Sequence, residues 1–214
     1  MPAYVEGTDT KIAPIVSSEK AARIILKRWD KRFHRTADFL VIEGAHAGGH
    51  LGFSKEQLSH LYESDYDSQY DEEIRRIITC AKEYADKYQT SIPVVVAGGI
   101  MNENQVRHIL ELGADGIQVA TPFVTTEECD AADAFKQAYV DARPEDIEIV
   151  TSPVGMPARA IHYPFLEKIS HGKECITKCY RCLEKCNPKE APYCITQALI
   201  RAVKGDVNDG LIFC

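Results

Sequence analysis

Residues 92–100 read IPVVVAGGI, an unbroken apolar run that is followed at once by two glycines. A strand that is apolar at every position is typical of a parallel sheet, because both faces of such a sheet are buried. Glycines directly after the strand permit a tight turn and let a ligand approach the main chain closely. The stretch therefore predicts a buried parallel strand that ends in a loop suited to ligand binding.

Three more apolar runs share this character, and amphipathic helical patterns follow them. The predicted strands cover residues 11–16, 39–43, 92–97 and 116–120. The predicted helices cover residues 18–30, 71–88, 103–112 and 127–141. Strands that alternate with helices predict a parallel sheet covered by helices, so the expected fold class is α/β.

Four strand–helix units are half of a closed (β/α)8 TIM barrel, which normally takes about 250 residues. The chain has 214 residues. We therefore expect a half-barrel of TIM-barrel type with about four βα units. A doubly wound sheet of four or five strands also fits the count.

The overall charge excludes some classes of partner. A net charge of −7 gives no support to binding of nucleic acid or of an anionic membrane surface. No apolar run approaches the roughly 18 residues of a membrane span. Residues 1–10 lack the charged and apolar regions of a signal peptide, so the sequence predicts a cytoplasmic protein.

A second glycine-rich stretch carries a histidine. EGAHAGGHLGF, residues 43–53, places His50 directly behind Gly48 and Gly49, shortly after a predicted strand. Imidazole is the side chain whose free pKa lies nearest neutrality. The pattern indicates a ligand that lies against bare backbone with a proton-handling group beside it. A plain turn that contains a histidine fits these residues equally well.

Function in parallel α/β folds gathers where strands end and helices begin. Gly98 and Gly99 follow one predicted strand, and Thr121 ends the next. Glycine N–H groups beside a threonine hydroxyl can form a cradle for an anion. The two loops together favour a phosphate site, although AGGI alone also fits a tight turn.

Four stretches in this order, EGAHAGGHLGF, PVVVAGGI, GADGIQVAT and SPVGMPARAI, resemble the nitronate monooxygenase family, formerly called 2-nitropropane dioxygenases. The resemblance covers roughly residues 11–165 and implies the C-terminal half of an FMN-dependent TIM barrel. The FMN-dependent enoyl-ACP reductases are close relatives of this family. The expected domains are an FMN-binding half-barrel over residues 1–165 and a cysteine-rich, mainly helical segment over residues 166–214 that packs on it.

The resemblance also implies roles for single residues. His50 matches the histidine that acts as catalytic base near the flavin. The positions expected to contact FMN are Glu43, Gly48, Gly49, Gly98, Gly99, Gln118, Val119, Ala120 and Thr121. Two of them depart from the family's usual pattern, because position 43 is often Gln and Ala120 replaces a glycine.

The implied function is oxidation of alkyl nitronates by O2, with FMN as cofactor. A substrate with an acidic C–H needs a base that works near pH 7, which imidazole supplies. The flavin takes the electrons and reacts with oxygen, while the protein positions the reactants. The alternative enzyme is an NAD(P)H-dependent flavin reductase, including the enoyl reductase type.

The cysteines cluster in CITKCYRCLEKC, residues 175–186. Their C-x3-C-x2-C-x3-C spacing differs from a bacterial ferredoxin run in the first gap, and a four-thiolate zinc site is the other metal option. The cysteines also suit one face of a helix, where they would only pack. No metal ligand is assigned to the four cysteines: Cys175, Cys179, Cys182 and Cys186.

The expected partners follow from the fold and the chemistry. A small molecule, a nitronate or a similar compound, is the expected substrate. A half-barrel leaves the edges of its sheet unpaired, which favours a homodimer or pairing with a separate N-terminal half-barrel. A non-catalytic half-barrel module is therefore the alternative from another class of protein. An electron-transfer or sensing role for the cysteine cluster is a third hypothesis.

Overall fold

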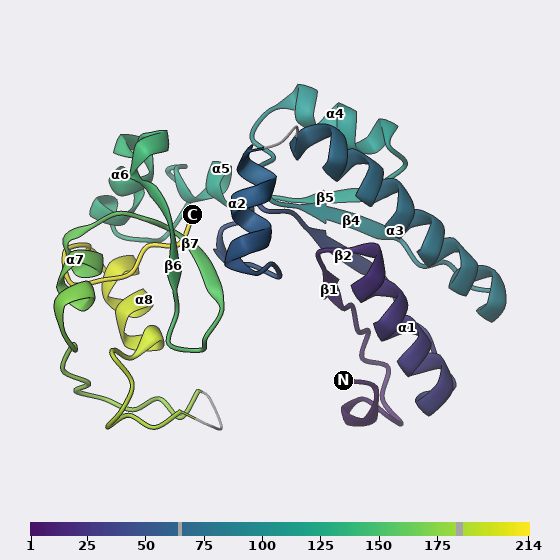
Figure 1. Ribbon diagram of the computed structural model, residues 1–214, viewed down its shortest axis with the longest axis horizontal. Helices are drawn as coiled ribbons and strands as arrows, with labels where there is room; N and C mark the ends of the chain where they lie inside the picture. The colour runs from purple at the N-terminus through teal and green to yellow at the C-terminus, as the bar shows by residue number, and fades with distance from the viewer. Residues whose placement is uncertain (64–65, 183–185) are drawn as a thin grey trace. The chain divides into compact units, whose positions relative to one another are not determined.

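The fold is described from a computed structural model, over residues 1–63, 66–182 and 186–214 (Figure 1). The chain divides into two compact units. Unit 1 comprises Met1–His46 and Gly52–Val119, and unit 2 comprises Ala47–Leu51 and Ala120–Cys214. The later unit begins at Ala120, and residues 47–51 join it; the domain boundary expected near residue 165 stays a prediction.

Unit 1 is built on a four-stranded parallel sheet in the order β1-β2-β4-β5. All four predicted strands are present, and each is shorter than its apolar run. The strands are β1 (Ile15–Val16), β2 (Leu40–Glu43), β4 (Val94–Ala97) and β5 (Gly116–Gln118). The predicted parallel sheet is confirmed.

The helices of unit 1 begin where the sequence provides capping side chains. Ser18 caps α1 by accepting a hydrogen bond from the Ala21 N–H, and Asn102 forms a capping box with Gln105 at the start of α4. The helical elements are η1 (Pro2–Tyr4), α1 (Glu19–Phe33), α2 (Lys55–Glu63), α3 (Tyr66–Tyr88) and α4 (Glu103–Glu111). In the described part of the chain, no helix combines the length and apolar character needed to cross a membrane.

The core of unit 1 lies between one face of the sheet and helices α1, α3 and α4. Alternate strand residues share this face, as Leu40 and Ile42 do on β2. They pack against buried helix residues that include Leu26, Ile77 and Ile109. Figure 1 shows α1 and α3 running side by side over this sheet. The register is fixed by this burial, because a shift of one residue would turn the apolar side chains away from the helices.

Unit 2 contains a three-stranded antiparallel sheet in the order β3-β7-β6. The strands are β3 (Gly49–His50), β6 (Ile147–Thr151) and β7 (Pro157–Ile161). The helices are α5 (Thr121–Val124), α6 (Asp133–Asp141), η2 (Pro144–Asp146), α7 (Pro164–His171) and α8 (Ile195–Val203). One core cluster joins Ala160 of β7 to Phe165 of α7 and to Tyr193.

The helix expected over residues 127–141 begins only at Asp133. The N–H of Ala132 donates to the Val203 carbonyl, so the chain is held to the end of α8 at the point where the helix begins. A separate helix, α5, forms at Thr121–Val124, where Pro122 in the first turn favours a helix start.

The described residues between α7 and α8 are not helical, so the expectation of a cysteine-bearing helix face is wrong. The side chain of Gln197 explains the irregular backbone. Its Oε1 accepts hydrogen bonds from the N–H groups of Thr177 and Lys178, and its Nε2 donates to the Cys175 carbonyl. These bonds replace the contacts that a helix would make within the segment.

Candidate functional site

The carboxyl ends of three strands in unit 1 lie side by side. Glu43 of β2 pairs with Ala97 of β4, and Ala97 pairs with Gln118 of β5. The structure therefore brings together two predicted site residues, Glu43 and Gln118, and places Gly98 directly after the residue between them. This is the edge of a parallel α/β sheet at which ligands usually bind.

The turn after β4 provides free backbone donors. Gly98 and Gly99 have φ angles of +97° and +73°, which favour glycine over other residues. Among the described residues, no backbone carbonyl accepts a hydrogen bond from either N–H group. Consecutive N–H groups in such a turn form a concave site that binds anions. The turn has the donor chemistry that a phosphate group requires.

Gly99 also needs its small size. A Cβ atom at this position would lie 2.9 Å from the Cβ of His46, closer than real side chains approach. The backbone of Gly99 itself is exposed, so a ligand can reach it. His46 and Gly99 thus form a tight contact on one side of the turn, while the other side stays open to solvent.

Glu43 supplies a carboxyl group at this edge. The side chain is partly buried, and burial raises the pKa of its carboxyl above the usual value. Glu43 therefore places a partly desolvated carboxyl group at the strand end that pairs with Ala97.

The segment after β5 passes from unit 1 into unit 2. Gln118 is exposed, and Val119 packs against the core of unit 1. Ala120 is the N-cap of α5, and its carbonyl accepts from the N–H groups of Phe123 and Val124. Thr121 is the first residue of that short helix.

His50 lies in unit 2 and is held by backbone pairing and by one side chain. Its strand β3 pairs with β7, with His50 opposite Ala158. The His50 Nε2 atom lies 2.8 Å from the Oγ of Ser152, which is buried. The imidazole also contacts the edge of the Phe213 ring, with centroids 5.3 Å apart. The ring is therefore oriented by two residues that follow it by more than 100 positions.

The surroundings of His50 favour its neutral form. The side chain is partly buried, and desolvation lowers the pKa of the imidazole below its usual value. A neutral imidazole carries one nitrogen lone pair that can accept a proton.

The two glycines before His50 are required by close packing against the end of the chain. A Cβ at Gly48 would lie 2.4 Å from the backbone carbon of Cys214. A Cβ at Gly49, whose φ is +76°, would lie 3.3 Å from the Phe213 ring. Both glycines therefore pack against the last two residues of this chain, within unit 2.

Two residues beside His50 were not singled out by the sequence. Ser152 stands in the quoted stretch SPVGMPARAI, but nothing in its spacing indicates a contact with a residue 102 positions earlier. Phe213 lies in an apolar run typical of a core segment. The antiparallel pairing of β3 with β7 brings His50 to the hairpin that carries Ser152, and a bridge between Phe213 and Ala160 of β7 brings Phe213 there.

The described cysteines do not form a metal site. Among residues 1–63, 66–182 and 186–214, no group of three or more His, Cys, Asp or Glu side chains is arranged to hold a metal ion. Cys175, Cys179, Cys182 and Cys186 are exposed thiols in the described backbone.

Comparison with known proteins identifies the family. Residues 5–214 match the family model of nitronate monooxygenase. The chain is 28% identical over 164 residues to a probable nitronate monooxygenase of Staphylococcus saprophyticus, and equally so to one of Staphylococcus aureus strain Newman. Each match spans 77% of this chain but 39% of the relative.

Solved structures show the same fold. FabK from Thermotoga maritima matches with a TM-score of 0.65 and 25% identity, over 98% of this chain and 55% of that one. A nitroalkane oxidase from Streptomyces ansochromogenes matches with a TM-score of 0.59 and 22% identity, over 96% and 51%. The predicted partial barrel of TIM-barrel type is confirmed. By sequence and by fold, this chain belongs to the nitronate monooxygenase family.

Proposed function

We propose that this chain contributes the FMN-binding and proton-accepting groups of an oxidoreductase of the nitronate monooxygenase type. Its substrate is a small alkyl nitronate or the nitroalkane from which a nitronate forms. The observation that carries the proposal is His50, a partly buried imidazole whose pKa is lowered and whose ring is held by Ser152.

The residues of unit 1 fit the phosphate group of FMN. The free N–H groups of Gly98 and Gly99 would donate to the phosphate oxygens, as backbone donors do in other phosphate sites. Gln118, exposed at the neighbouring strand end, would add a side-chain amide donor. Glu43 and Val119 complete the proposed contacts within unit 1. FMN supplies electron acceptance and reaction with O2 when bound.

His50 would act as the base. We assign its Nε2–H as the donor to the Ser152 hydroxyl, which leaves the Nδ1 lone pair free to accept a proton. With a nitroalkane, this lone pair takes the proton from the carbon next to the nitro group. The C–H electron pair moves onto the nitro group and gives the nitronate. With a preformed nitronate, no proton needs to be removed.

This difference between substrates provides the test. With FMN-loaded protein, His50→Asn should reduce turnover of nitroethane about a hundredfold or more, because general-base catalysis contributes about that much. Turnover of ethyl nitronate should fall far less. Equal losses with both substrates, or no loss with nitroethane, would exclude the base role of His50.

An NAD(P)H-dependent flavin reductase is the second candidate. The similarity to the FabK structure extends over 98% of this chain, which supports a flavin reductase as the alternative function. The same protein preparation should be assayed for NAD(P)H oxidation with and without an electron acceptor. Rapid NAD(P)H oxidation without nitronate turnover would select this candidate over the first.

A further inference from the structure

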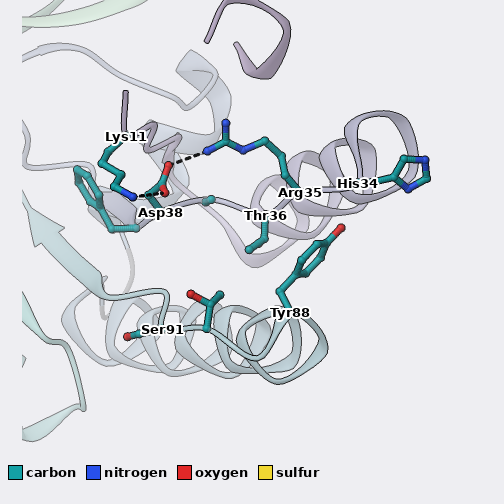
Figure 2. Close-up of a pocket in the computed structure, with 10 residues that line it drawn as sticks. Lys11, His34, Arg35, Thr36, Asp38, Tyr88 and Ser91 are labelled. Atoms are coloured by element: carbon teal, nitrogen blue, oxygen red, sulfur yellow. Dashed lines mark hydrogen bonds and ion pairs between the residues drawn. The ribbon is translucent and has the colours of Figure 1, made fainter. Parts of the chain in front are cut away.

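A cavity of about 480 Å³ lies at the edge of the unit 1 sheet where the strands begin, opposite the edge that carries Gly98 and Gly99. Its walls come from the segments that lead into three of the parallel strands, residues 11, 34–39, 88 and 90–91 (Figure 2). The volume falls in the range of small-molecule sites, about 300–1,000 Å³. This cavity therefore has the size of a ligand site but no part in the function proposed above.

Thr36 places an unpartnered hydroxyl at this cavity. The residue is only 8% exposed, and its Oγ1 atom is buried without a hydrogen-bond partner in the described structure. Figure 2 shows its side chain between the segment that carries Arg35 and the one that carries Tyr88. Buried hydroxyls almost always have a partner. Because the Oγ1 atom is closed to solvent in this structure, the Thr36 side chain must turn toward the cavity that it lines in order to donate to a ligand there.

Two cations line the same cavity with donors to spare. One nitrogen of Arg35 lies 2.9 Å from the Asp38 carboxylate, and the Lys11 ammonium lies 3.6 Å from it. A guanidinium carries five N–H donors and an ammonium three, so one carboxylate does not use them all. The formal charge of these three side chains sums to +1.

Asp38 is itself fully engaged by the protein. Besides the two cations, its Oδ2 accepts a hydrogen bond of 2.8 Å from the Ile12 N–H. The opposite wall adds Thr90 and Ser91, whose hydroxyls make no hydrogen bond within the described residues. The cavity thus offers hydrogen-bond donors on both sides and a net positive charge.

We propose that this cavity is a binding site for a small oxyanion, a molecule that carries a phosphate or a carboxylate group. Arg35 and Lys11 would pair with the charge, and the Thr36 hydroxyl would donate to one oxygen. The Arg35 guanidinium can donate two parallel N–H hydrogen bonds to two oxygens of a phosphate or carboxylate. This pairing fixes the orientation of the bound oxyanion.

Calorimetric titration with inorganic phosphate, and separately with succinate, tests the proposal at low ionic strength. At least one anion should bind saturably, and the better one shows which oxyanion the site prefers. Arg35→Gln should weaken that binding about tenfold or more, because it removes a charged donor. Thr36→Val, which keeps the side-chain shape, should weaken it about threefold to tenfold.

Arg28→Gln is the matched control, because Arg28 is an exposed cation on α1 that does not line the cavity. It should leave the affinity within about twofold, because Arg28 does not line the cavity and makes no direct contact with a bound anion. The melting temperature of each variant, measured without added anion, shows that the protein is folded. Thr36→Val should melt at or above the wild-type temperature in that condition, since it removes an unpartnered buried hydroxyl.

Absence of binding by both anions would overturn the proposal. So would binding that survives in Arg35→Gln and Thr36→Val, as it would if phosphate bound only at the Gly98–Gly99 turn. Neither result depends on FMN or on turnover, so failure of this site and failure of the proposed function are distinguishable.

Discussion

His50 Nε2 and Ser152 Oγ lie 2.8 Å apart in unit 2, although 102 positions separate the two residues in the chain. A turn holds Ser152 in place, with the Gly155 N–H donating to its carbonyl and the Val154 N–H donating to its hydroxyl. The serine is buried, so its hydroxyl has few other orientations. This contact selects the orientation of the imidazole and, in the proposed mechanism, its tautomer.

Ser152→Ala should therefore lower kcat/KM for a nitroalkane by about twofold to tenfold, the value of one ordinary hydrogen bond. The acidic limb of its pH profile should also shift, because the imidazole loses a partner, whereas a purely structural effect would leave the profile in place. Ser170→Ala is the control, since its exposed hydroxyl bonds only to the Glu167 carbonyl. An unchanged rate and profile in Ser152→Ala would contradict the positioning role.

The ionisation of His50 can be measured directly. Because burial lowers the pKa of His50, the imidazole should titrate below the usual value of about 6.5 in an NMR titration of the folded protein. The stability linked to this group is present above pH 6.5 and is lost as the pH falls through the lower folded pKa. His50→Gln should accordingly lose less stability than wild type on acidification. Titration of His50 above pH 6.5 would contradict the assignment.

Glu43 should show the opposite dependence on pH. Burial raises the pKa of Glu43 in the folded protein. Its contribution to the free energy of unfolding is therefore favourable below pH 4.5 and is lost as the pH rises through the pKa of the folded state. Glu43→Gln should therefore gain stability relative to wild type in urea unfolding at pH 8 but not at pH 4. Glu111→Gln, at an exposed site, serves as the control. An equal effect at both pH values would show that ionisation is not responsible.

Gly48 tests the packing that supports His50. A methyl group there would meet the Cys214 backbone at 2.4 Å, so Gly48→Ala should reduce the free energy of unfolding by about 1–3 kcal/mol. Gly172→Ala provides the comparison, because a Cβ at Gly172 meets nothing within 4 Å and its φ of −174° suits any residue. Chemical denaturation of both variants measures the difference. Similar stabilities would mean that the chain end does not pack against Gly48.

The parallel sheet could be predicted because two of its strands lie in nearly continuous apolar runs. LVIE and VVVA stand out from the sequence for this reason. The hairpin of β6 and β7 could not, because Glu148 and Arg159 interrupt IEIVT and PARAI, whose apolar residues form no continuous run. The observed strands are also shorter than the apolar runs that predicted them. Burial by the helices, and not hydrophobicity alone, decides where strand pairing stops.

The candidate site was predictable only in part. Glycines after strands and a histidine in a glycine-rich loop are local signals, and they led to Gly98, Gly99 and His50. The Ser152 contact depends on a long-range strand pairing that no local pattern encodes. The cysteine segment was mispredicted for a related reason, because Gln197, well beyond the cluster, binds its backbone.

The central claim is that the Gly98–Gly99 turn binds the phosphate of FMN, and paired titrations with FMN and riboflavin test it most directly. Riboflavin lacks the phosphate, so FMN should bind at least about tenfold more tightly to the wild-type chain. Gly99→Ala, with its Cβ 2.9 Å from His46, should remove most of that preference. Gly7→Ala, which has a similar φ of +76° but open space around it, should retain the preference. Equal affinity for FMN and riboflavin in the wild type, or an unchanged preference in Gly99→Ala, would contradict the account.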